Sequence, residues 1–239
     1  MKYDVVIIGG GAGGLATAIA EKTLYPEKSV LVVRRTNKQP IPCGVPYIVE
    51  SIGSVDDNII PDSIYEEMGI DLIIDEVIDI DVENKKLRTK EGRELAYQKL
   101  VIATGSRPTR LKIPGIDLRN VILVHKEYEP LKDVFKELKQ AKKIVIIGAG
   151  FVGMEFADDL ANGREIHVVE ILHEALPLAF DKEFGEMARK ELEAKGVKFH
   201  LGVSVKEIKG NEKVEKVILS DGTEITADVV IVSVGIAPN

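Results

Sequence analysis

The chain has 239 residues, of which 45% are hydrophobic and 30% are charged, so it is long enough for one or two domains with a sizeable core. Its formal net charge of −7 argues against nucleic acid as a main partner, because phosphate binding needs clustered Lys and Arg. No apolar segment approaches the ~20 residues of a membrane span, so no membrane association is expected.

The first predicted element is a buried strand over Val5–Ile8, followed by a glycine cluster and a helix from Ala12. Gly9, Gly11 and Gly14 have the spacing G-x-G-x-x-G. The first glycine allows a tight turn, the second lets a pyrophosphate approach the backbone, and the third lets helix and strand pack closely. Phosphates would bind the free N–H groups at the helix N-terminus. Taken alone, the motif also fits a tight turn without a ligand.

The second predicted strand, Val30–Val33, ends at Arg34 and Arg35. In dinucleotide-binding units an acid about 20 residues past the glycines binds a ribose hydroxyl, so an arginine departs from the usual pattern. A polar loop leads to Cys43, and residues 43–48 begin a predicted helix with Cys43 in or next to its first turn. The positive end of a helix favours a reactive thiolate. The alternative is that a lone cysteine is a small buried hydrophobe.

The rest of the first half is predicted from apolar runs separated by turn residues. We expect a short helix, a pair of strands, two turns of a β-meander, a strand returning to the sheet and a linker: Pro61–Met68, Gly69–Ile80, Asn84–Lys86, Glu91–Arg93, Leu100–Ala103 and Ser106–Gly115.

The second half repeats the first. The strand Ile144–Ile147 precedes Gly148, Gly150 and Gly153, and a helix is predicted over Phe151 to about Ala161. The segments EGRELAYQKLVIATG and DGTEITADVVIVSVG align without a gap. A repeat of this length predicts two copies of one dinucleotide-binding unit. We therefore expect an α/β fold of two Rossmann-like three-layer units, each with a β-meander, divided into residues 1–112 and 113–239.

The second strand of the second unit, Glu165–Val169, ends at Glu170. An acid at this position suits ribose hydroxyls and repels a 2′-phosphate, which favours NADH over NADPH. The alternative is an ordinary exposed charge at a strand end. Two helices complete this unit: Glu129–Gln140 is amphipathic, and Asp181–Lys195 has an Asp at the N-cap and a glycine behind it.

The four histidines have no metal-ligand spacing, and a single cysteine cannot complete a set, so no metal site is expected. They are His125, His167, His173 and His200. The single cysteine also forbids an intrachain disulfide, and the first residues enter a strand rather than a signal peptide. Both features favour a cytoplasmic protein.

The chain resembles the flavin-dependent pyridine nucleotide-disulfide oxidoreductases, in the single-cysteine branch of NADH oxidases, NADH peroxidases and coenzyme A-disulfide reductases. The segments that carry the resemblance are VVIIGGGAGG, PCGVPY, KLVIATGSRP, IVIIGAGFVGMEFA and VVIVSVGIAPN. The resemblance implies FAD in the first unit and NAD(H) in the second, with NADP(H) less favoured. Electrons would pass from NAD(P)H through the flavin to Cys43 and on to a disulfide, a polysulfide or oxygen.

The resemblance also implies the residues of each site. For FAD they are Gly9, Gly11, Ala12, Gly13, Gly14, Arg34, Arg35, Cys43, Val77, Ala103, Thr104, Gly105 and Ser106. For NAD they are Gly148, Gly150, Phe151, Val152, Gly153, Glu155, Glu170 and Gly235. Cys43 is the expected catalytic residue.

Several residues depart from the family pattern. Ala12 stands where the oxidases and peroxidases usually have a histidine, which argues against peroxide chemistry assisted by that group. The residues before Cys43 do not match the Ser-Phe pattern of the coenzyme A-disulfide reductases, so coenzyme A binding is in doubt. Phe151 stands where many members have a tyrosine that gates the nicotinamide pocket.

The family continues past the segment that ends at Asn239 with a second FAD segment and a dimerisation domain. We therefore expect a truncated flavin site that holds FAD weakly, and a homodimer only at full length. Two alternatives to a disulfide or polysulfide reductase remain open. One is a nucleotide-binding fragment without turnover, and the other is an NADH-dependent reductase of a small electron-carrier protein, with Cys43 merely structural.

Overall fold

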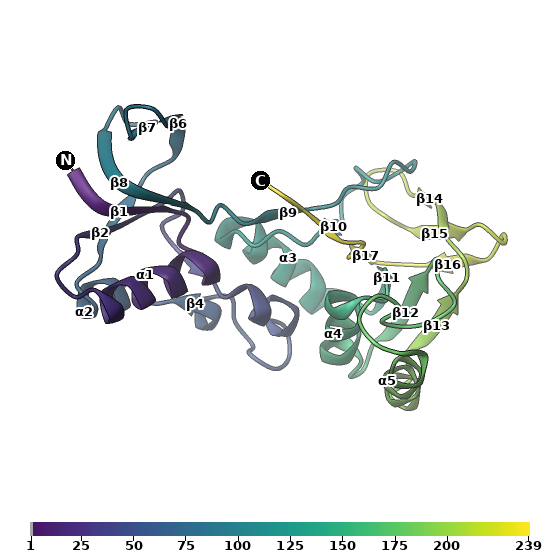
Figure 1. Cartoon of the computed structure of the whole chain (residues 1–239). Helices are drawn as coiled ribbons and strands as arrows, with labels where there is room; N and C mark the ends of the chain where they lie inside the picture. The colour runs from purple at the N-terminus through teal and green to yellow at the C-terminus, as the bar shows by residue number, and fades with distance from the viewer. Residues whose placement is uncertain (1) are drawn as a thin grey trace.

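Each of the two predicted glycine-containing units has a parallel sheet at its centre in the computed structural model, which describes residues 2–239 (Figure 1). Strand β1 (Lys2–Ile8) lies between β2 (Val30–Arg34) and β8 (Glu94–Ile102). Strand β11 (Lys143–Ile147) lies between β12 (Glu165–Glu170) and β17 (Val229–Val232). The strands that lead into the glycine loops are therefore central and buried, as continuous apolar runs indicate.

The first sheet has six strands in the order β5-β2-β1-β8-β7-β6. Strand β1 pairs with β2 and β8. Strand β5 (Asp71–Ile74) pairs with β2, β7 (Lys86–Thr89) pairs with β8, and β6 (Val77–Asp81) pairs with β7. The long strand β8 pairs parallel to β1 at one end and antiparallel to β7 at the other. The meander is thus an extension of the central sheet.

The alternation along β1 divides the first unit into three layers. Val5 and Ile7 pack with Ala18 of α1 (Ala12–Leu24) and Tyr65 of α2 (Ser63–Glu67). Val6 and Ile8 point to the other face, among side chains of β7 and β8. Successive residues of a strand face opposite sides, so one buried strand supplies both cores.

The second sheet has five parallel strands in the order β10-β17-β11-β12-β13. Strand β11 pairs with β17 and β12. Strand β10 (Val121–Leu123) pairs with β17, and β13 (Lys198–Leu201) pairs with β12. The helices of this unit are α3 (Tyr128–Gln140), α4 (Phe151–Leu160) and α5 (Lys182–Ala194).

The meander of the second unit is a separate sheet of β14 (Val205–Lys209), β15 (Lys216–Leu219) and β16 (Glu224–Thr226). Residues 227–228 interrupt the strand between β16 and β17, and there the Asp228 carboxylate accepts hydrogen bonds from the backbone N–H groups of Lys142 and Lys143, both at 2.9 Å. The aligned position in the first unit is Gln98, which lies within the continuous strand β8.

A segment of the first unit packs into the core of the second. It contains β3 (Gln39–Pro40), the 3₁₀ helices Pro42–Tyr47 and Asp56–Asn58, and β4 (Ile59–Ile60). The buried side chains of Val45 and Ile48 share a hydrophobic cluster with Phe156 and Leu160 of α4. Since a buried apolar side chain of this size contributes about 1.5–3 kcal/mol, this cluster joins the two units firmly.

Asp159 of α4 adds polar contacts to this junction. Its side chain is buried and accepts hydrogen bonds from the backbone N–H of Glu50 at 3.1 Å and of Ser51 at 2.9 Å, and from Ser51 Oγ at 2.6 Å. The buried carboxylate is therefore satisfied entirely by the segment of the first unit that follows Cys43.

The two connections between the units pair with each other. Strand β9 (Ser106–Pro108) is antiparallel to β18 (Ile236–Pro238), which runs beside it near the C-terminus in Figure 1. Asn239 extends the pairing, since its N–H donates to Gly105 O at 3.1 Å and its Nδ2 to Thr104 O at 2.8 Å.

The predicted α/β class with two glycine-loop units is confirmed. The structure differs from the sequence-based expectations in detail. The segment that contains Cys43 forms a short 3₁₀ helix, Pro42–Tyr47, with Pro46 inside it, rather than the start of an α-helix. Asp181 occupies the N-cap of α5, but its side chain makes no capping hydrogen bond. The predicted linker contains β9, whose partner β18 is distant in sequence. Within residues 2–239 no helix has the length and apolar character needed to cross a membrane.

The junction generates a stability prediction. Asp159→Ala removes a buried carboxylate and leaves the N–H groups of Glu50 and Ser51 without their acceptor, so we expect a loss of about 1–3 kcal/mol in the free energy of unfolding. Urea unfolding followed by circular dichroism measures this loss. Asp133→Ala, on the exposed face of α3, is the control and should change stability by less than about 0.5 kcal/mol. An equal effect of the two substitutions would contradict the role given to Asp159.

Candidate functional site

The first glycine loop permits no side chain at two of its three motif positions. Gly9 has φ +111°, and a Cβ there would lie 2.1 Å from the carbonyl oxygen of Ala103. A Cβ on Gly14 would lie 1.9 Å from the carbonyl oxygen of Gly9. A Cβ on Gly11 would meet no atom within 4 Å. The first and third glycines are therefore required by the fold, while the second faces open space.

The second loop repeats this geometry. Gly148 has φ +105°, and its Cβ would lie 2.6 Å from the carbonyl oxygen of Ser233, which aligns with Ala103. A Cβ on Gly153 would lie 2.0 Å from Gly148 O, and one on Gly150 would meet nothing within 4 Å. In each loop a bare backbone thus faces a space that a phosphate group can enter.

The helices behind the loops begin without a capping side chain. Gly11 and Gly150 occupy the N-caps of α1 and α4, and neither first turn contains an acidic residue. The first N–H groups of a helix need an acceptor, and the helix dipole favours an anion there. Together with the open space over each N-cap glycine, these donors fit the pyrophosphate of a dinucleotide.

Most of the predicted FAD residues gather at one edge of the first sheet. Gly9–Gly14, Arg34–Arg35 and Ala103–Ser106 follow the carboxyl ends of β1, β2 and β8. Ala12, Gly13, Thr104 and Gly105 are exposed there. This edge is where parallel α/β sheets bind their ligands. Val77, at the start of β6, comes three residues after β5 ends at Ile74 and packs against the cluster that contains Ile8 and Val33.

The two arginines at the end of β2 are in different environments. Arg34 is 2% exposed, and its guanidinium is bound by Asp62 and by backbone carbonyl groups. Arg35 is exposed and forms an ion pair with Glu127, which precedes α3 in the second unit. A pocket of about 520 Å³ lies beside this ion pair, lined by residues 35–38 and 127–130.

The predicted NAD residues form the corresponding group in the second unit. Gly148, Gly150 and Gly153 follow β11, Glu170 ends β12, and Gly235 follows β17 with φ +113°. Phe151 and Val152 are the exposed first residues of α4. The structure therefore brings the predicted NAD residues of the loops together at the carboxyl edge of the second sheet.

Glu170 does not project freely from its strand. It is 9% exposed, and its carboxylate accepts hydrogen bonds from the backbone N–H of Ala149 at 2.8 Å and of Leu172 at 2.9 Å. Glu170 thereby fixes the glycine loop while placing a negative charge beside it. A fixed charge at this point opposes a second negative group, such as a 2′-phosphate.

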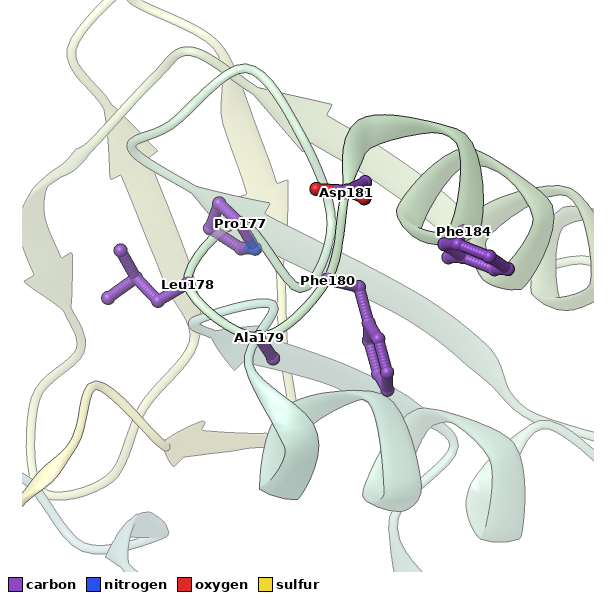
Figure 2. Close-up of a pocket in the computed structure, with 6 residues that line it drawn as sticks. All are labelled: Pro177, Leu178, Ala179, Phe180, Asp181 and Phe184. Atoms are coloured by element: carbon purple, nitrogen blue, oxygen red, sulfur yellow. The ribbon is translucent and has the colours of Figure 1, made fainter.

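Aromatic side chains lie beside the second loop. The ring of Phe151 packs edge-on against that of Phe180, with centroids 5.6 Å apart. Phe180 and Phe184 line a pocket of about 410 Å³ at the start of α5, shown in Figure 2 with Pro177, Leu178, Ala179 and Asp181. Neither Phe180 nor Phe184 belongs to a sequence motif, so the sequence alone gives no sign of a functional role for them.

Cys43 is exposed on the 3₁₀ helix Pro42–Tyr47. The buried side chain of Asn58 holds this loop, since its Nδ2 donates to Ile41 O at 3.0 Å. A Cβ on Gly44 would lie 2.0 Å from Asn58 Oδ1, so the loop also needs a glycine next to the cysteine. The Cys43 thiol therefore lies at the surface, on a loop that the Asn58 side chain holds in place.

The cysteine loop lies against α4. The 3₁₀ helix Pro42–Tyr47 packs on α4, and burial followed by the negative charges of Glu155, Asp158 and Asp159 raises the pKa of Tyr47. Burial also raises the pKa of Glu155, which is half-buried. Through this contact the helix that starts at the second glycine loop and the segment that carries Cys43 become neighbours.

Two of the histidines are neighbours in space. His167 Nδ1 lies 2.9 Å from His200 Nε2 on the adjacent strands β12 and β13. Burial and the neighbouring His167 lower the pKa of His200. Residues 2–239 contain no group of three or more His, Cys, Asp or Glu side chains arranged to hold a metal ion.

The sequence was compared with a family model, and residues 3–239 match the model described as pyridine nucleotide-disulphide oxidoreductase. The chain belongs to this family. An NADH oxidase of Methanocaldococcus jannaschii is 35% identical over 98% of the chain and 54% of the relative. An NAD(P)H coenzyme A polysulfide/persulfide reductase of Pyrococcus horikoshii is 35% identical over 100% of the chain and 55% of the relative.

A solved structure is also similar. The ferredoxin reductase for the CYP199A2 system of Rhodopseudomonas palustris superposes with a TM-score of 0.89 at 28% identity, over 99% of this chain and 60% of that one. The chain spans about half the length of the curated relatives it matches. Membership of the pyridine nucleotide-disulphide oxidoreductases implies the use of FAD and NAD(H), and both glycine loops have a geometry that fits a dinucleotide.

The open space over Gly150 generates a binding prediction. Gly150→Ala places a methyl group where the NADH pyrophosphate would lie, without touching protein atoms. We expect the free energy of unfolding to change by less than about 0.5 kcal/mol and the NADH dissociation constant to rise at least about tenfold. Fluorescence titration with NADH measures the latter.

Two matched substitutions serve as controls for the NADH affinity of Gly150→Ala. Gly11→Ala makes the same change in the first loop and should leave NADH affinity unaltered. Gly153→Ala should instead destabilise the fold, because its Cβ meets a backbone oxygen at 2.0 Å. Wild-type NADH affinity in Gly150→Ala would show that the second loop is not the pyrophosphate site.

Proposed function

We propose that the chain is the FAD- and NADH-binding part of an oxidoreductase that reduces a disulfide or polysulfide at Cys43. Bound FAD would supply two-electron transfer between the nicotinamide and the sulfur. Gly9–Gly14 and Ala103–Ser106 would hold FAD in the first unit, and Gly148–Gly153 with Glu170 would hold NADH in the second.

The observation that carries this proposal is the packing of α4 against the cysteine loop. A redox relay needs donor, cofactor and acceptor within contact distance, in fixed orientation. Here the helix that starts at the second glycine loop is buried against the segment from Val45 to Ser51, just after the exposed thiol. The same contact anchors both ends of the proposed relay.

The proposed reaction balances as NADH plus a disulfide plus one proton giving NAD⁺ and two thiols. The Cys43 thiolate attacks one sulfur of the substrate, forms a mixed disulfide and releases the first thiol. Two electrons from NADH then cleave the mixed disulfide, which releases the second thiol and restores the thiolate. A single exposed cysteine suffices for this cycle, because the substrate supplies the partner sulfur.

A second candidate is the NADH-dependent reduction of a small electron-carrier protein. The similarity to a ferredoxin reductase at a TM-score of 0.89 and 28% identity favours it. In that reaction electrons would leave the flavin singly, and Cys43 would have no chemical role. The two candidates therefore differ in whether the thiol is needed.

Substitution of Cys43 separates these candidates. We expect Cys43→Ser to leave the reduction of bound FAD by NADH intact, since the nicotinamide would lie on the opposite flavin face, and to abolish the NADH-dependent release of thiols from a disulfide. Stopped-flow absorbance follows the first reaction and a thiol assay the second. Ile41→Val, an exposed change in the same loop, is the control. Full disulfide reduction by the serine variant would favour the electron-carrier reductase.

Glu170 generates a prediction on nucleotide selectivity. We expect wild-type protein to prefer NADH over NADPH, and Glu170→Ala to narrow the preference by weakening NADH about tenfold rather than by improving NADPH. The substitution removes the acceptor of the Ala149 and Leu172 N–H groups as well as the ribose partner. Dissociation constants for both nucleotides measure the effect, and equal or better binding of NADPH by wild type would contradict it.

A further inference from the structure

The two units differ in charge at one equivalent position. In the first unit Gly9 N donates to Val33 O at 2.8 Å, and in the second Gly148 N donates to Val169 O at 2.8 Å. The residues that follow these carbonyls, Arg34 and Glu170, therefore end their strands at corresponding places. Where the second unit has a carboxylate, the first has a guanidinium.

Arg34 is turned away from solvent beneath the first glycine loop. Its Cδ would lie 2.7 Å from a Cβ on Gly10, and the guanidinium carbon lies 5.8 Å from the ring centroid of Tyr65. The Tyr65 hydroxyl in turn donates to Gly10 O at 3.3 Å. The aliphatic part of Arg34 and the ring of Tyr65 thus pack against the first glycine loop at Gly10.

The charged end of Arg34 holds a carboxylate. Its Nη2 donates to Asp62 Oδ2 at 2.7 Å, and Nη1 lies 2.7 Å from Asp62 Oδ1 as an ion pair without hydrogen-bond geometry. Nε and Nη2 also donate to the carbonyl oxygens of Thr36 and Asn37. Four contacts hold the rigid guanidinium fork, and the two to Asp62 fix the orientation of that carboxylate.

The Asp62 carboxylate remains accessible although it is paired. The Asp62 side chain is 49% exposed, whereas that of Arg34 is 1% exposed. An ionised carboxylate has about four acceptor positions, and the guanidinium occupies one on each oxygen. Each oxygen of Asp62 therefore keeps an acceptor position for a donor on its open side.

From this arrangement we propose that Asp62 supplies the ribose-binding carboxylate that β2 lacks. Asp62 binds the adenosine ribose hydroxyls of FAD at the edge of the first loop, and Arg34 is the positioning residue that orients it. The inference rests on the proposed function, because it requires FAD in the first unit. It explains how the loop can accept a dinucleotide although its second strand ends in a cation.

The test is a ligand-by-variant cycle on the full 239-residue chain. Asp62→Asn keeps an acceptor for Arg34 but loses the charge and one acceptor oxygen. The probes are FAD and an FAD analogue whose adenosine ribose lacks both hydroxyls, titrated by quenching of flavin fluorescence. Glu67→Gln, an exposed acid on the same short helix α2, is the matched control.

We expect Asp62→Asn to weaken FAD about tenfold and to leave the affinity for the dideoxy analogue unchanged, while Glu67→Gln alters neither. NADH binding in the second unit should be unchanged in both variants, which shows that the fold is intact. If Asp62→Asn weakens FAD and the analogue equally, or neither, Asp62 is only a partner of Arg34 and the inference is wrong. If wild type binds NADH but not FAD, the proposed function itself fails.

Discussion

The burial of α4 between its own sheet and the segment Val45–Val55 of the first unit is the contact on which the arrangement of the molecule depends. One face of the helix covers β11 and β12, and the other receives the 3₁₀ helix that carries Cys43. Protein interiors are close-packed and do not deform continuously. A helix buried on both sides therefore fixes the second glycine loop and the cysteine loop relative to each other.

Much of the fold could be predicted from the sequence because the decisive constraints are local. Gly14 excludes a side chain because of the carbonyl oxygen of Gly9 in the same loop, and Gly153 does so because of that of Gly148. The strands before them are continuous apolar runs, and the helices after them follow at once. Such constraints are expressed within a few residues, so the motif spacing is enough to reveal them.

The features that sequence reasoning missed are contacts between residues far apart in the chain. Asp159 lies in the last turn of α4 and binds a segment 108 residues away, and β9 pairs with β18 near the end of the chain. The pairing of His167 with His200 depends on the order of strands in the sheet. No local pattern distinguishes such an aspartate or histidine from a solvated one, so these contacts need the tertiary structure.

Arg34 shows why a departure from a motif is harder to interpret than a match. From the sequence, an arginine in place of an acid indicates either a contact with phosphate or adenine, or a weakened site. In the structure a buried guanidinium needs a paired anion, and the anion comes from Asp62, 28 residues later. The backbone of the first unit, like that of the second, is set by glycines that tolerate no Cβ. The side chains at the strand ends are free of that constraint, so the charge that faces a ligand can come from a different element in each unit.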